Sequence, residues 1–308
     1  MATITAKDVA ALRAKTGIGM MECKKALVEA EGDMDAAIKL LREKGELKAE
    51  SKMATRIAAD GIVDVLAENG KTAIVEVNTE TDFVAKNEMF KEFVKNLLKS
   101  IIANNPADVE ALLASDYEGT TVDAKLKELI FQIGEKITIR RFAVVEGVTS
   151  TYIHGMGSIG VIVKFDTDCA DNADFAEFAK NIALQVGAYP TPYLDRNSVP
   201  ADVIESEKNI IKAQLANDPK MANKPEKVLD GIIMGKLGKF YENNCLVDME
   251  YVKAEDHESV AKYVANTAKA MGGKIAIASF VRFEKGEGIE KRQDDLAAEV
   301  AKLTGQAQ

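Results

Sequence analysis

Apolar positions in residues 1–45 recur at helical spacing in three short runs, which predicts three helices. Asp33 is a candidate N-cap for the third helix, and Gly45 is its expected end. We therefore expect a compact three-helix module, followed by a charged helical or flexible linker, over residues 1–55. The first two helices are expected between Thr5 and Gly17 and from about Met20 to Ala30.

From Gly61 the apolar period changes to two, which is typical of a half-buried strand. Two such runs are separated by Asn69-Gly70, a pair that favours a tight hairpin turn. A polar loop from Thr79 to Lys86 follows, and Asn87 then begins a helix with one apolar stripe. These patterns predict a second, mixed α+β unit over residues 56–140.

The same order of strand and helix returns further along the chain. Residues 162–167 repeat the pattern of residues 74–79 at an offset of 88, and residues 172–181 repeat that of residues 87–96 at an offset of 85. The first copy therefore has three additional residues between its strand and its helix. This repeat predicts a core of two related α+β subdomains.

Residues 201–244 show only helical periodicity, in two runs separated by the break at residues 217–219. Because strand character resumes later, we interpret this helical hairpin as an insertion within the second subdomain, which comprises residues 141–200 and 245–284. Such an arm either packs on its own body or recruits a partner, and homodimerisation through it is one possibility. Residues 285–308 predict an amphipathic C-terminal helix.

Composition narrows the classes of function. The chain has 308 residues and 47 % hydrophobic content, which is enough for about two folded domains. A net charge of −9 gives no bulk attraction to phosphate backbones or anionic lipids, so we expect no direct nucleic-acid partner and no membrane. Three widely spaced cysteines fit reduced thiols, and the start lacks a signal-peptide pattern. A cytoplasmic protein is expected.

Residues able to carry bond chemistry are scarce. His154 and His257 are too few and too far apart to form a metal cluster, so we expect no metal and no cofactor. Residues 155–160 fit a GxGxxG pattern loosely but run into a strand, which favours a simple turn over a nucleotide site. Cys23 beside two lysines is either an activated thiol or a small buried core residue, and burial is favoured. We therefore expect no enzyme activity.

Phe83 is an unusual residue in the loop that carries the extra residues. It stands beside Asp82 in a polar segment, where an aromatic side chain either folds back onto the core or points at a partner. The equivalent loop of the second copy, residues 168–171, is shorter and has no aromatic residue. The shared framework does not require Phe83 for packing, which favours a wedge presented to a partner protein.

Met20 and Met21 are a second unusual feature. Adjacent helical residues point about 100° apart, so both methionines cannot lie on one buried stripe. Either both pack partly into the small module, or they form an adaptable contact surface together with Leu12 and Arg13.

At these two places the sequence closely resembles the elongation factor Ts family, whose members are guanine-nucleotide exchange factors for elongation factor Tu. The matching stretches are residues 12–27 and 76–86, with further likeness at 139–141, 152–155 and 280–291. The resemblance implies a ubiquitin-associated-like N-terminal module, two related core halves, a hairpin arm and a C-terminal helix. The module, the first half and the C-terminal helix would contact the nucleotide-binding domain of elongation factor Tu, and the second half its third domain.

The resemblance also implies roles for individual residues. A loop that displaces Mg²⁺ from the partner would promote GDP release without bond-making chemistry, so that GTP can rebind.

One departure from the family pattern follows His154. Residues 155–160 are longer by one residue than the usual pattern and lack its basic residue. An adaptor that only binds partners and a thiol enzyme using Cys23 are the alternative functions. The expected site residues are Thr81, Asp82, Phe83 and Val84 for Mg²⁺ displacement, and Leu12, Arg13, Met20, Met21 and His154 for partner binding.

Overall fold

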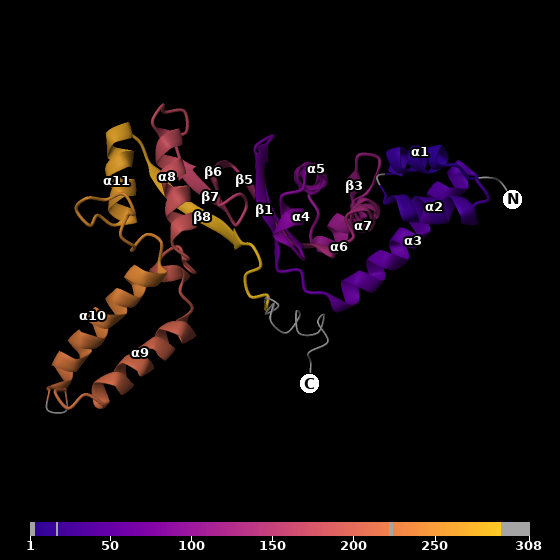
Figure 1. Ribbon diagram of the computed structural model, residues 1–308. Helices are drawn as coiled ribbons and strands as arrows, with labels where there is room; N and C mark the ends of the chain where they lie inside the picture. The colour runs from indigo at the N-terminus through magenta and orange to yellow at the C-terminus, as the bar shows by residue number, and fades with distance from the viewer. Residues whose placement is uncertain (1–3, 17, 222–223, 291–308) are drawn as a thin grey trace.

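The computed structural model describes residues 4–16, 18–221 and 224–290, and the side chains of residues 45–55 are outside that description. Two three-stranded antiparallel sheets pack face to face, and helices cover the outer face of each (Figure 1). Three helices stand at one end of the elongated molecule, and a two-helix arm projects at the other. The fold is therefore α+β, as the sequence predicts.

The three predicted N-terminal helices are present and share one small core. Asp33 caps the third helix by accepting hydrogen bonds from the backbone N–H groups of Asp35 and Ala36. That helix does not end at Gly45, as expected, but continues through Thr55, because the following residues are mostly strong helix formers that offset the roughly 1 kcal/mol cost of one glycine. The bounds are α1 (Ala6–Thr16), α2 (Met20–Glu29) and α3 (Met34–Thr55).

The first sheet has the strand order β1-β2-β5. Asn69 and Gly70 have φ angles of 55° and 75°, so the predicted tight hairpin turn is confirmed. The strands are β1 (Asp60–Glu68), β2 (Lys71–Thr79) and β5 (Ile137–Glu146), with the small pair β3 (Asp116–Tyr117) and β4 (Thr120–Thr121). The helices of this half are α4 (Asp82–Ala85), α5 (Glu88–Asn104), α6 (Val109–Ala114) and α7 (Val122–Ile133).

The second sheet repeats this plan with the strand order β6-β7-β8. Its strands are β6 (Val148–His154), β7 (Ile159–Thr167) and β8 (Ile275–Glu284), and its covering helices are α8 (Phe175–Ala188) and α11 (Val260–Met271). The register of β2 on β5 shifts after Glu76, and that of β7 on β8 shifts after Lys164, which is the same position at the predicted offset of 88. Helices α7 and α11 are also equivalent, since each has 12 residues and an N-cap hydroxyl, from Thr121 and Ser259.

The arm consists of two helices, as the periodicity predicts. Its own apolar contacts centre on Ile211, Leu215 and Ile233, and it follows a short 3₁₀ turn. Homodimerisation through this arm stays a prediction. The bounds are η1 (Arg196–Ser198), α9 (Ala201–Ala216) and α10 (Glu226–Asn244). No helix in the described part of the chain is both long enough and apolar enough to cross a membrane.

The C-terminal helix expected over residues 285–308 is not found where the chain is described. Residues 285–290 form turns and irregular backbone rather than helix, and residues 291–308 lie outside the described part. Gly286 and Gly288 have φ angles of 70° and 72°, a left-handed conformation that does not continue a helix.

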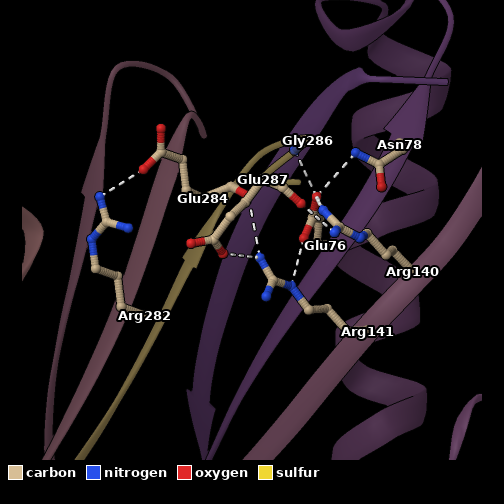
Figure 2. A network of polar contacts seen from close by, with 8 residues as sticks. All are labelled: Glu76, Asn78, Arg140, Arg141, Arg282, Glu284, Gly286 and Glu287. Carbon is tan, nitrogen blue, oxygen red and sulfur yellow. Dashed lines mark hydrogen bonds and ion pairs between the residues drawn. The ribbon is translucent and has the colours of Figure 1, made fainter. Parts of the chain in front are cut away.

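The buried carboxylate of Glu76 on β2 joins the first sheet to the chain just after β8 (Figure 2). Its Oε1 accepts hydrogen bonds from Arg140 Nη1 at 2.9 Å, Asn78 Nδ2 at 3.1 Å and the Gly286 backbone N–H at 2.8 Å. Its Oε2 accepts from Arg141 Nε at 2.6 Å. The side chain is fully buried, so these four donors provide the partners that a charge removed from water requires.

The same arginines bind the chain just after β8. Arg140 donates to the Glu287 carbonyl oxygen, and Arg141 Nη2 donates to Glu287 Oε2 at 2.9 Å and to the Glu284 carbonyl oxygen at 3.2 Å. Lys285 also pairs with Asp60 at the start of β1. The network therefore fixes the chain after β8, a strand of the second sheet, against the first sheet.

Protonation of Glu76 is coupled to folding. Burial alone raises the pKa of the carboxyl, but the hydrogen bonds from Gly286, Arg140, Asn78 and Arg141 outweigh burial and hold the pKa below its usual 4.5. Because the folded-state pKa is the lower one, ionised Glu76 stabilises the fold above the unfolded pKa. This stabilisation is lost as pH falls through the folded pKa.

We expect Glu76→Gln to lower the free energy of unfolding at pH 7 by about 1–3 kcal/mol, because Arg140 and Arg141 both lose their charged acceptor. The difference from the unsubstituted chain should shrink as pH falls below 4.5, measured by urea unfolding at each pH. Glu146→Gln, on an exposed residue at the end of β5, is the control and should change little. A difference that is constant between acid and neutral pH would contradict this account.

Candidate functional site

The loop between β2 and α5 contains a single helical turn, α4, with some side chains in the core and one at the surface. Val84 and Ala85 are each only 7 % exposed and belong to the core of the first half, whereas Phe83 is 79 % exposed. Thr81 is the N-cap of the turn, and its hydroxyl accepts from the Val84 backbone N–H at 3.5 Å. The packing of Val84 and Ala85 thus holds Phe83 outward, which contradicts the alternative that it folds onto the core.

The base of this loop is tied to the start of β5. Glu80 Oε1 accepts from the Lys136 backbone N–H at 2.5 Å, and Glu80 Oε2 lies 3.1 Å from Arg56 Nη1. Thr81 donates from its backbone N–H and its hydroxyl to the two carboxylate oxygens of Glu135, at 3.1 and 2.8 Å. Phe83 is therefore carried by a turn with fixed ends rather than by a free loop.

Asp82 lies beside Phe83 at the surface. Its Oδ2 is 2.6 Å from the ammonium group of Lys86, one helical turn later. The hydrogen bond from Lys86 lowers the pKa of Asp82, and the positive charge of Lys285 lowers it further. The exposed aromatic ring therefore stands next to a carboxylate that is ionised at neutral pH.

On the N-terminal module the structure exposes both methionines. Met20 is 44 % and Met21 68 % exposed, and Arg13 is also exposed. Leu12, in contrast, is fully buried among the three helices, so the expectation that its side chain belongs to the surface is wrong. Helical geometry explains the difference, because position 12 faces α2 and α3 while position 13 is turned about 100° away.

Cys23 is a core residue of the module. Its side chain is fully buried, and its thiol donates to the Ile18 carbonyl oxygen at 3.5 Å. The interpretation as a small buried residue is therefore confirmed, and the thiol is not accessible to a substrate. Cys169 and Cys245 are likewise buried and free.

His154 ends strand β6 on the other sheet and is exposed, with Nδ1 2.8 Å from the Tyr152 hydroxyl. Residues 155–158 form the turn to β7, so the expected turn is confirmed. The Gly157 carbonyl oxygen accepts from the Val63 backbone N–H at 2.8 Å, which places this turn against β1 of the first half. Across the residues described, no three His, Cys, Asp or Glu side chains are grouped so that they could hold a metal ion.

Helix α7 connects the module to the half that carries Phe83 (Figure 1). Phe131 packs against the apolar core of the module, and Gln132 Nε2 donates to the Thr16 carbonyl oxygen at 3.1 Å. The predicted residues thus lie on three parts of the molecule. One part carries Arg13 and the methionines, the second carries residues 81–84, and the third carries His154.

The sequence over most of this framework matches a known family. Residues 80–287 match the sequence model of the family described as Elongation factor TS. The chain belongs to the elongation factor Ts family. Elongation factor Ts from Syntrophotalea carbinolica is 44 % identical over 306 residues, and that from Nautilia profundicola is 45 % identical over 308 residues. The protein of the same name from Clostridium botulinum is 44 % identical over 311 residues. Each alignment covers 98 % of this chain and 99 % of the relative.

Membership of the elongation factor Ts family confirms the resemblance seen in the two long motifs and makes the chain a factor of translation elongation. Sequence reasoning did not identify the residues that hold the loop, namely Glu80, Glu135 and Lys136. The available signal was a polar Gly134-Glu135-Lys136 segment between an apolar helix and an apolar strand. The contacts of this segment with the loop join residues more than 50 positions apart in the sequence, so no local pattern predicts them.

The exposure of Phe83 has a direct consequence for stability. We expect Phe83→Ala to change the free energy of unfolding by less than about 0.5 kcal/mol, because little apolar contact is lost. Phe90→Ala, in a side chain that is fully buried in the same half, should cost about 3–5 kcal/mol. Thermal and urea unfolding of both variants measure this contrast. A large loss of stability in Phe83→Ala would show that the ring packs on the core in solution.

Proposed function

We propose that this chain is a guanine-nucleotide exchange factor that binds elongation factor Tu in its GDP-bound form, promotes GDP release and allows GTP to rebind. The observation that carries the proposal is Phe83, a large apolar side chain that is 79 % exposed on a turn with fixed ends. Exposure of such a ring is unfavourable unless a partner covers it, and rigid aromatic anchors are typical of interface centres. Family membership supports the choice of partner.

The proposed mechanism requires only that Mg²⁺ in the partner is displaced. GDP in a GTPase is held through its phosphates and an octahedral Mg²⁺, whose geometry tolerates little movement of its surroundings. Residues 81–84 enter the partner as a wedge, with Phe83 moving the groups that orient the ion and Asp82 available for a polar contact. The binding of GDP to the partner is weakened without any covalent bond being made or broken in this chain. The protein is therefore not an enzyme in the chemical sense.

The remaining surfaces provide binding. The N-terminal helices act as a ubiquitin-associated-like module whose Arg13, Met20 and Met21 contact the nucleotide-binding domain of the partner, and His154 contacts its third domain. Because coupling is reciprocal, a factor that lowers GDP affinity is itself bound less tightly when GDP is present. Excess GTP then rebinds and releases the exchange factor.

The test is release of a fluorescent GDP analogue from purified elongation factor Tu at increasing concentrations of this chain. We expect the release rate to rise to a plateau, and Phe83→Ala to lower the plateau several-fold with little change in the half-saturating concentration. The double variant Arg13→Ala, Met20→Ala is the matched control. It should raise the half-saturating concentration and preserve the plateau, because those side chains bind but do not displace.

Removal of free Mg²⁺ by a chelator should reduce the difference between Phe83→Ala and the unsubstituted chain, because the ion is then already absent. A defect that is insensitive to chelator would contradict the Mg²⁺ step alone. A release rate that does not respond to this chain would contradict exchange and favour an adaptor that only binds its partner.

A further inference from the structure

The internal repeat provides a natural comparison for the loop that carries Phe83. In the first half Glu80 Oε1 accepts from the Lys136 backbone N–H at 2.5 Å. In the second half Asp168 Oδ1 accepts from the Lys274 backbone N–H at 2.6 Å, at the equivalent place. A carboxylate that ties the strand-to-helix loop to the third strand is therefore common to both halves, and it does not depend on an exposed aromatic residue.

The residues next to this shared contact differ between the halves. The first half has Thr81 and Glu135, joined by hydrogen bonds of 3.1 and 2.8 Å. The equivalent positions in the second half are Cys169, which is buried, and Gly273. A Cβ added at position 273 would clash with the Cys169 sulfur and the carboxylate of Asp168, so no side chain can reach that loop from there. The paired contact of Thr81 with Glu135 is confined to the copy with Phe83.

Thr81 controls the orientation of the turn that follows it. Its hydroxyl caps the Val84 backbone N–H, and its carbonyl oxygen accepts from the Thr79 hydroxyl at 2.9 Å. Glu135 binds both the backbone N–H and the hydroxyl of the same residue. Every polar group of Thr81 is thus engaged, and Phe83 follows only two residues later. Loss of Glu135 would remove two of these hydrogen bonds and loosen the N-cap.

Glu135 also relates the loop to the N-terminal module. It follows the C-cap Gly134 of α7, the helix whose Phe131 and Gln132 contact that module. The end of α7 therefore fixes Phe83 relative to the surface that carries the exposed methionines Met20 and Met21. If the turn that carries Phe83 is held in place, the free energy of binding can be used to displace groups in the partner. If the turn is loosely held, Phe83 moves instead of the partner.

We propose that Glu135 is a positioning residue for nucleotide exchange, which holds Thr81 and through it sets the direction in which Phe83 meets the partner. This inference rests on the proposed function. Glu135 supports the wedge without forming part of the binding surface, so it affects the maximal rate of exchange and not the affinity.

The experiment measures fluorescent GDP release from elongation factor Tu with three variants of the full chain. Glu135→Ala should lower the plateau rate at least about threefold, with an unchanged half-saturating concentration. Glu135→Gln should restore the rate, because its amide oxygen can accept from the Thr81 N–H and its amide nitrogen can donate to the hydroxyl. Asp168→Ala removes the corresponding tie in the second half, and it should reduce stability while leaving the plateau unchanged.

Two further measurements separate positioning from a general loss of structure. The double variant Phe83→Ala, Glu135→Ala should have the same plateau as Phe83→Ala, because Glu135 acts through that ring. Hydrogen exchange at the amides of residues 84–86 should be faster in Glu135→Ala than in Glu135→Gln. Additive losses in the double variant, or unchanged amide exchange, would overturn the inference.

The same experiment distinguishes failure of the proposed function from failure of the proposed role of Glu135. If the unsubstituted chain does not accelerate GDP release, exchange itself is contradicted. If it does accelerate release and Glu135→Ala reaches the same plateau, only the role of Glu135 is contradicted.

Discussion

Each half of the core depends on a carboxylate that ties its strand-to-helix loop to the residue just before its third strand: Glu80 accepts from the Lys136 backbone N–H, and Asp168 accepts from the Lys274 backbone N–H. A strand-to-helix loop at the end of a sheet leaves backbone groups without sheet partners, and this contact satisfies one of them while fixing the loop. Because the exposed ring of Phe83 makes no core contact, this tie does not depend on it. Next to this contact the first half has Thr81 and, two residues later, the exposed ring of Phe83, whereas the second half has the buried Cys169 at the position of Thr81 and no aromatic residue in the loop.

The two halves differ just as clearly inside the sheets. Glu76 and Lys164 occupy the same position beside the register shift, yet Glu76 is fully buried and Lys164 is not. The buried carboxylate binds the chain after β8, so the end of the second half is fixed on the first. This difference between the halves fixes the start of the C-terminal segment against β5 of the first half.

The sequence predicted those parts that local chemistry determines. Asn69-Gly70 supplies the two positive φ angles of a hairpin turn, and the repeat at offsets of 88 and 85 identified Phe83 by comparison with a loop that lacks it. Contacts between distant segments were not predictable. Glu76 meets its arginines and Thr81 meets Glu135 only after the third strand joins the sheet. The burial of Leu12 was also not predicted, because helical periodicity identifies an apolar stripe on a helix but does not show which neighbouring helix covers it.

Phe83 is exposed in the free chain, and the proposed exchange requires the partner to cover it. The most direct measurement is the ¹⁹F resonance of 4-fluorophenylalanine placed at position 83, recorded with a soluble paramagnetic agent before and after addition of elongation factor Tu bound to GDP. We expect strong broadening by the agent in the free chain, and a shifted, protected resonance in the complex. A ring that remains accessible to the agent in a complex that still releases GDP rapidly would contradict this expectation.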